Sequence, residues 1–234
     1  MTGGSIVIGS KLHPMDLRLE RDIAGMFDAQ QTLMARIADL TDEEVLLPSR
    51  LPDWTVGHVL THIARNGDSF AWRLEGSARG EVVDQYPGGA DRRAADIEAG
   101  AARTSAELFA DLVTVHERLD VAVGCMQGDA WDAVTRDLGG TLRPARDLPV
   151  RRWREVEVHH VDLGLGYEIT DWPDEFVERS CPQRSPVSGP ASPESPTSTP
   201  RPGWPGCSAG SRRPGCPNCC RSDSDPSGAG KLRP

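Results

Sequence analysis

Three side chains that lie far apart in the sequence could together bind a metal ion: His62, Glu155 and His159. Glu155 and His159 are four residues apart, so a helix would place them one above the other on a single face. A histidine from a second helix could meet them and complete a set of two imidazoles and one carboxylate. Such a set suits a zinc-like divalent metal and leaves one coordination position open for water or substrate.

Other interpretations of the histidines remain open. His58 and His62 are also four apart and could act as a pair, although position 62 continues the apolar stripe of its predicted helix better than position 58 does. A single inward histidine is more often a hydrogen-bonded core residue than a ligand. We expect the two remaining distant histidines, His13 and His116, to lie at the surface.

The neighbours of the proposed ligands have less specific roles. Glu157 and His160 should point away from the face shared by Glu155 and His159, toward the surface or into a supporting shell. Asp162 either accepts a hydrogen bond that orients a ligand ring or is simply a carboxylate at the helix end.

Amphipathic helices are predicted to carry these residues, because apolar side chains recur at helical spacing. The predicted helices span residues 15–39, 54–75, 90–123 and 149–165. Thr41-Asp-Glu-Glu44 has the form of a capping box, Asp53 or Thr55 could cap the second long helix, and Pro149 suits a first helical turn. Residues 131–143 indicate a strand or hairpin. Without a repeating β–α pattern, an all-α four-helix bundle is the expected fold.

The composition limits the possible partners. The chain has 234 residues with 35 acidic and 26 basic side chains, a net charge of −9, which argues against binding to nucleic acid or an anionic membrane surface. There is no apolar run long enough to cross a bilayer and no secretory signal pattern, so we expect a cytoplasmic protein. Cys125 is the single cysteine before residue 180, which excludes a disulfide within that part.

Residues 180–234 have a different composition from the rest. They hold 12 of the 19 prolines and no Ile, Phe, Tyr, Met or His. Such a Pro/Ser/Gly-rich segment cannot bury enough apolar surface to fold, so we expect a disordered tail. It is either a natural tail or, as the abrupt change suggests, a frameshifted remnant of a C-terminal domain. Cys216 and Cys219 have CxxC spacing, but no second ligand pair follows, which favours incidental cysteines over a zinc knuckle.

Three segments resemble the mycothiol-dependent maleylpyruvate isomerases, which are DinB-like metal-binding bundles. They are Trp54-Thr-Val-Gly-His-Val-Leu-Thr-His-Ile-Ala64, the run from Tyr86 to Arg103, and Arg152-Trp-Arg-Glu-Val-Glu-Val-His-His-Val-Asp-Leu-Gly164. The resemblance covers about residues 15–178, within an expected bundle domain of residues 12–178. It places the metal ligands of that family on His62, Glu155 and His159, in agreement with the spacing argument.

The resemblance also implies a chemistry. A divalent metal, with Zn²⁺ as the first candidate, would bind the thiol of mycothiol and lower its pKa. In the isomerase, the thiolate adds to the cis double bond of maleylpyruvate, the resulting single bond rotates, and loss of the thiol gives fumarylpyruvate. Related members transfer the thiol to electrophiles. The implied partners are a low-molecular-weight thiol and a small electrophilic substrate, with the protein a monomer or homodimer.

The sequence departs from this family at its C-terminal end. Isomerases of the family carry a second domain that contributes an arginine for the substrate carboxylates, and nothing after Ser180 resembles it. We expect Arg151, Arg152 and Arg154 to be surface charges rather than replacements. Two alternatives therefore stay open: a non-catalytic metal-binding bundle, and a metal-dependent hydrolase with Asp68 or Asp162 as its base.

Overall fold

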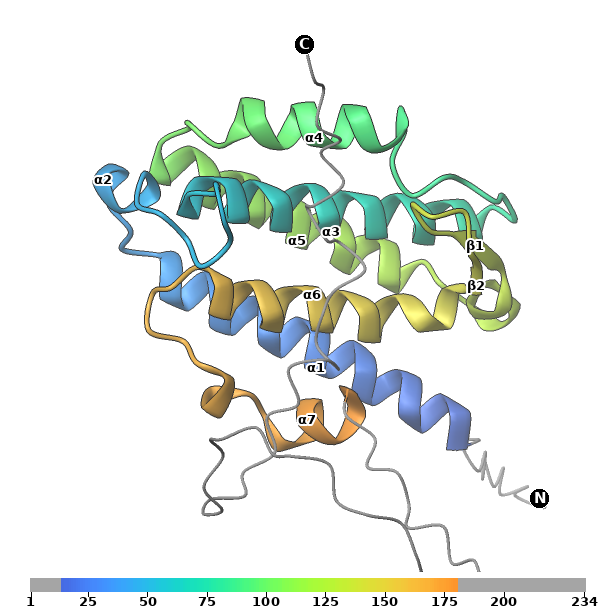
Figure 1. Cartoon of the computed structure of the whole chain (residues 1–234). Coiled ribbons are helices and arrows are strands. Elements are labelled where there is room, and N and C mark those ends of the chain that lie inside the picture. The colour runs from blue at the N-terminus through green and yellow to red at the C-terminus, as the bar shows by residue number, and fades with distance from the viewer. Residues whose placement is uncertain (1–13, 181–234) are drawn as a thin grey trace, which may run out of the picture. The chain divides into compact units, whose positions relative to one another are not determined.

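Four long helices form a closed bundle in the computed structural model, which describes residues 14–180 (Figure 1). Around the bundle, α1 packs against α6, α6 against α3, α3 against α5, and α5 against α1. This ring of contacts confirms the predicted all-α fold. The four helices are α1 (Pro14–Ile37), α3 (Val56–Ala78), α5 (Ser105–Gly124) and α6 (Leu148–Asp162).

The apolar stripes of the four helices meet in a common core. One residue or more from each helix is fully inaccessible to solvent, and burying a side chain of this size stabilises the fold by about 1.5–3 kcal/mol. These core residues include Leu33, Val59, Ile63, Leu112, Leu119 and Val156. The helical periodicity of the sequence therefore identified the faces that pack together.

Capping boxes begin both α2 (Asp42–Val45) and α3. Thr41 caps the short helix α2, and the Glu44 carboxylate accepts a hydrogen bond from the Thr41 amide, as predicted. Thr55 rather than Asp53 caps α3: its hydroxyl accepts the amide of His58, whose ring in turn bonds the Thr55 amide. Capping of this kind satisfies amides that have no partner within the helix.

The single helix predicted over residues 90–123 is wrong, because the chain breaks there into α4 (Gly89–Gly100) and α5. Thr104 caps α5 and forms a capping box with Glu107. The apolar periodicity continues across the break and concealed it. The helix α4 packs on the outside of α3, where a Cβ on Gly100 would lie only 2.5 Å from Thr61 Cγ2. Close approach of the two helices therefore depends on glycine at the end of α4.

The predicted hairpin is confirmed. Strands β1 (Val134–Arg136) and β2 (Leu142–Pro144) pair antiparallel with Thr135 opposite Arg143. Short 3₁₀ turns flank the hairpin, η1 (Gly128–Asp132) before it and η2 (Ala145–Asp147) after it. The second turn leads directly into α6, which has Pro149 in its first turn.

The chain after α6 holds one more turn and the start of a second structural unit. The 3₁₀ turn η3 (Ile169–Asp171) ends the first unit, and the second begins at Pro173 with α7 (Asp174–Ser180). The rest of the predicted tail, with its CxxC pair, lies outside the described residues, as does His13. Of the helices between residues 14 and 180, none combines the length and apolar character needed to cross a bilayer.

Arg152 is buried in the bundle, so its predicted surface position is wrong. Its side chain is fully inaccessible, and its guanidinium donates to Gln30 Oε1, the Ile63 carbonyl and Asn66 Oδ1. These three acceptors are uncharged. Burial consequently lowers the pKa of Arg152 to about 10, although the guanidinium remains charged at neutral pH.

His116 also lies deeper than the surface position expected for it. Burial, with the positive charge of Arg152 nearby, lowers the pKa of His116 to about 3, and its Nε2 atom is buried without a hydrogen-bond partner. In the unfolded chain the same imidazole should titrate near pH 6.5. Between these two values the unfolded state binds more protons, so stability must fall as the pH is lowered through this window.

We therefore expect acid to destabilise the wild-type protein more than a His116→Gln variant. At pH 5 the free energy of unfolding should lose about 1–2 kcal/mol through this residue relative to pH 7. Urea unfolding of metal-free wild type and variant at both pH values measures the difference. An identical pH dependence in the two proteins would contradict this assignment.

Candidate metal centre

Helices α3 and α6 bring His62, Glu155 and His159 together at one point. The Nε2 atom of His62 lies 3.0 Å from Nε2 of His159 and 3.3 Å from Oε2 of Glu155. Oε2 of Glu155 lies 3.5 Å from Nε2 of His159. The three predicted residues thus converge, and each directs one potential ligand atom toward the other two.

The site is almost closed to solvent. His62 and His159 are 1% and 3% exposed, and the Glu155 side chain is 12% exposed. Burial of a carboxylate is costly unless it is paired or binds a metal. Glu155 is the most exposed of the three side chains.

The spacing of the three atoms fits a divalent cation. Zinc binds imidazole nitrogen and carboxylate oxygen at about 2.0–2.2 Å, and tetrahedral angles then place two ligand atoms about 3.3–3.5 Å apart. The two separations from Glu155, 3.3 and 3.5 Å, lie in this range, and the 3.0 Å between the two imidazole nitrogens is a few tenths of an ångström shorter. Three protein ligands are the number typical of zinc sites that keep one position for water or substrate.

Hydrogen bonds set the protonation of the three groups. Burial alone would raise the pKa of Glu155, but hydrogen bonds with His159 and His62 hold it well below its usual range. Burial lowers the pKa of His62 to about 3, with the neighbouring His159 acting in the same direction. Burial opposes charge on His159 as well, yet its bonds to Asp162 and Glu155 raise its pKa to about 9. Glu155 is therefore ionised, as a metal ligand must be.

Asp162 lies directly behind the ring of His159. Its Oδ2 atom is 2.9 Å from His159 Nδ1, which leaves Nε2 directed at Glu155 and His62. A carboxylate on the far nitrogen fixes the ring orientation and the tautomer of a metal-binding histidine. Of the two roles considered for Asp162, its position corresponds to the orienting one.

The competing histidine pair is not brought together with the site. His58 bonds Thr55 through Nδ1, and its Nε2 lies 3.3 Å from the exposed carboxylate of Glu98. Trp54 lies beside both rings, 6.0 Å from His58 and 5.7 Å from His62 between ring centroids. His58 therefore serves the helix cap.

Glu157 and His160 are buried, so a surface position for them is wrong. Glu157 accepts hydrogen bonds from Trp153 Nε1 and from the hydroxyl of Tyr167. Tyr167 stacks on the His160 ring with 3.8 Å between the ring centroids. This cluster holds the segment after α6 against the face of the helix opposite the candidate ligands.

Arg93, a residue that sequence reasoning did not identify, connects the candidate metal site to a neighbouring cleft. Arg93 on α4 donates from Nη2 to His62 Nδ1 over 2.9 Å, and it also lines a cleft of about 240 Å³. Asp68, considered as a hydrolytic base, lines this cleft too but is paired with Arg65 and Arg118. The one available signal for Arg93 was its place in the family-like segment from Tyr86 to Arg103.

Comparisons with known proteins agree with this architecture. The family described as the mycothiol maleylpyruvate isomerase N-terminal domain matches residues 27–164. Two crystal structures are similar, both of the mycothiol-dependent maleylpyruvate isomerase, one of them a histidine-to-alanine mutant. They are 25% and, for the mutant, 24% identical in sequence, each with a TM-score of 0.65 over 68% of this chain.

The similarity to those structures is partial in length. The chain covers 66% of each solved chain, somewhat less than two thirds. No protein in the curated collection matches the sequence. The family match alone spans more than half of the 234 residues. This chain therefore belongs to the family of the mycothiol maleylpyruvate isomerase N-terminal domain.

Proposed function

We propose that this protein is a metal- and mycothiol-dependent enzyme that isomerises a small electrophile or transfers the thiol to it. The proposal is supported by family membership, and it depends on one observation above all. Three ligand atoms from two helices, on His62, Glu155 and His159, lie within 3.0–3.5 Å of one another. The two cofactors would be mycothiol and a divalent metal, with Zn²⁺ as the first candidate.

Each residue of the site would have a distinct role in binding the metal. His62 and His159 would offer nitrogen donors once a metal displaces the proton that His159 holds, Glu155 offers one negative charge, and Asp162 holds the ring of His159 in place. A bound divalent cation supplies a Lewis acid that lowers the pKa of a thiol, so that thiolate is available at neutral pH. One carboxylate leaves part of the cationic charge uncompensated, and this favours an anionic sulfur over a neutral one.

The chemistry of the substrate follows from the thiolate. A thiolate adds to an electron-poor double bond, and reversal of the addition after rotation about the new single bond isomerises the substrate. Maleylpyruvate, named for the similar crystal structures, is the first candidate. If the new carbon–sulfur bond stays and the neighbouring carbon takes up a proton, the same addition would be a transfer of the thiol to the substrate.

The direct test is a titration of mycothiol into metal-loaded and metal-free protein, followed by turnover assays. We expect mycothiol to bind the zinc-loaded protein and not the metal-free form, and we expect maleylpyruvate to be consumed only when both are present. Calorimetry measures the binding, and absorbance measures the consumption of substrate. Zinc binding without affinity for the thiol would instead identify a non-catalytic metal-binding bundle. Turnover independent of thiol would identify a hydrolase.

A further inference from the structure

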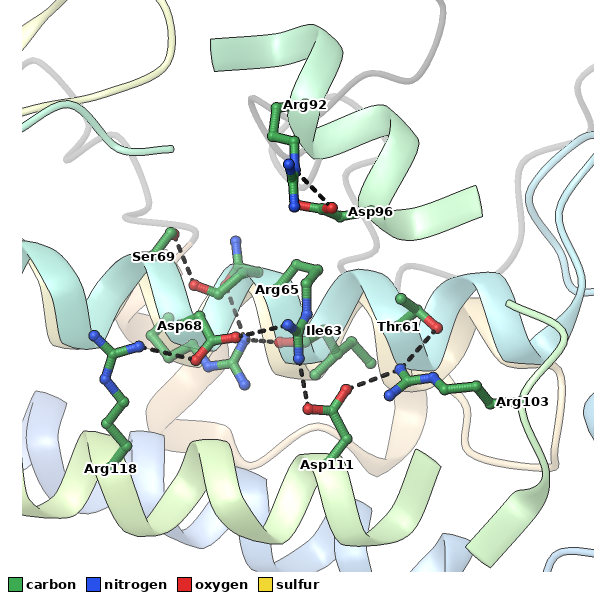
Figure 2. Close-up of polar contacts among 12 residues, drawn as sticks. Thr61, Ile63, Arg65, Asp68, Ser69, Arg92, Asp96, Arg103, Asp111 and Arg118 are labelled. Carbon is green, nitrogen blue, oxygen red and sulfur yellow. Dashed lines mark hydrogen bonds and ion pairs between the residues drawn. The ribbon is translucent and has the colours of Figure 1, made fainter. Parts of the chain in front are cut away.

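The arginines around the cleft differ in how their charge is balanced. Figure 2 shows ion pairs running between α3 and α5 below α4: Asp68 lies between Arg65 and Arg118, and Asp111 lies between Arg65 and Arg103. A further pair on α4 joins Arg92 to Asp96. The two other arginines that line the cleft, Arg65 and Arg118, are thus each paired with a carboxylate.

Arg93 differs from these arginines although it lines the same cleft. Its contacts in the structure are with the uncharged Nδ1 atom of His62, at 2.9 Å, and with the ring of Tyr86, whose centroid lies 5.6 Å from the guanidinium carbon. Neither partner is a carboxylate. The charge of Arg93 is therefore available to an anion in the cleft.

The contact between Arg93 and His62 is compatible only with the metal-free state of the site. A guanidinium has donors and no acceptor, so Arg93 must donate to a bare Nδ1 atom. A neutral histidine that binds a metal through Nε2 carries its hydrogen on Nδ1. Two donors would then face each other across 2.9 Å. Metal binding through Nε2 of His62 would therefore displace Arg93 from this contact.

Two buried arginines add positive potential near Glu155. Arg73 and Arg152 are 2% and 0% exposed, and their hydrogen bonds go to uncharged oxygens. Both are close enough to Glu155 for its charge to act on their pKa. Fixed positive charge in a region that excludes water favours an anionic ligand more strongly than it would in solvent.

We propose that Arg93 binds a carboxylate of the substrate in the cleft, and that metal binding at His62 frees it to do so. The ligand class is a small carboxylate-bearing electrophile, since one guanidinium recognises one carboxylate through two parallel hydrogen bonds. The inference rests on the proposed function, because it assumes that His62 is a metal ligand.

The test uses maleate, a plain dicarboxylate, as the probe and the full chain loaded with Zn²⁺. We expect calorimetry to show saturable binding to the wild type, affinity at least tenfold lower for Arg93→Gln, and affinity within twofold of wild type for Arg92→Gln. Arg92 is the matched control, because it is the adjacent arginine on the same helix and is already paired with Asp96. Equal maleate affinity in Arg93→Gln and wild type, or no saturable binding to wild type, would overturn the proposal.

A second measurement examines the displacement of Arg93. Competition with a chelator should give Arg93→Gln a zinc affinity equal to or higher than that of wild type, because a donor that opposes the metal-bound state has been removed. A tenfold loss of zinc affinity would show that Arg93 supports the ligand and would refute its release. Failure of the proposed function can be told apart from failure of this inference. If mycothiol neither binds nor promotes turnover, the proposed function fails. A tenfold difference in maleate affinity between Arg93→Gln and Arg92→Gln would still support Arg93 as the carboxylate-binding residue.

Discussion

Replacement of His159 by alanine is expected to remove stoichiometric zinc from the protein and to abolish mycothiol-dependent turnover. His159 supplies one of three ligand atoms and is fixed by Asp162, so its loss leaves two ligands and an open cavity. The effect on metal affinity should exceed the roughly 10–100-fold loss that is typical when a residue behind a ligand is changed. Elemental analysis of the purified variant measures the metal directly, and Glu155→Ala and His62→Ala should behave in the same way.

Three variants serve as controls for this prediction. His58→Ala and His160→Ala should retain full metal, because His58 caps α3 and His160 stacks on Tyr167. Asp162→Asn should be intermediate, with metal affinity lowered by about 10–100-fold while the ligand set stays complete. Full zinc content in His159→Ala would remove the proposed centre altogether.

Replacement of Gly57 by alanine is expected to destabilise the fold by about 3 kcal/mol, near the upper end for overpacking in a rigid core. A Cβ at this position would lie 2.2 Å from the backbone carbonyl oxygen of Ala101 and 3.0 Å from Val45 Cγ1. A backbone carbonyl cannot turn away as a side chain can, so the end of α4 must move. Urea unfolding of metal-free protein measures the loss.

Gly124→Ala provides the matched comparison. Gly124 is the last residue of α5, and a Cβ there would meet no atom within 4 Å. Because alanine favours the helix by up to about 1 kcal/mol over glycine, this variant should be neutral or slightly stabilised. Equal stability of Gly57→Ala and Gly124→Ala would mean that α4 can shift without cost.

The bundle itself was predictable because its information is local. Apolar side chains recur every three or four residues, and capping boxes such as Thr41 with Glu44 lie within four residues of sequence. The break between α4 and α5 is equally local, and the capping box of Thr104 with Glu107 would have revealed it. The apolar pattern continues through the break, so periodicity alone predicts one long helix.

The candidate site was predictable in its residues and not in its surroundings. Glu155 and His159 share a helix face, and His62 was the remaining inward histidine, so periodicity and residue type sufficed. Burial of Arg152 depends instead on acceptors from two other helices, Gln30 on α1 and Asn66 on α3. No local sequence pattern relates these residues to Arg152. The contact of Arg93 with His62 likewise depends on how α4 lies on α3, which sequence periodicity does not encode.

The two sides of the metal centre come from parts of the bundle that are far apart in sequence. His62 and His159 are 97 residues apart, and the intervening chain holds the hairpin and two of the packed helices. An ion held between them would act as a removable cross-link across this span, present only in the native arrangement. Ligands that bind only the native state raise its stability in proportion to the logarithm of their concentration over the dissociation constant. The melting temperature of the protein should consequently report metal occupancy in any preparation, even where no substrate has been identified.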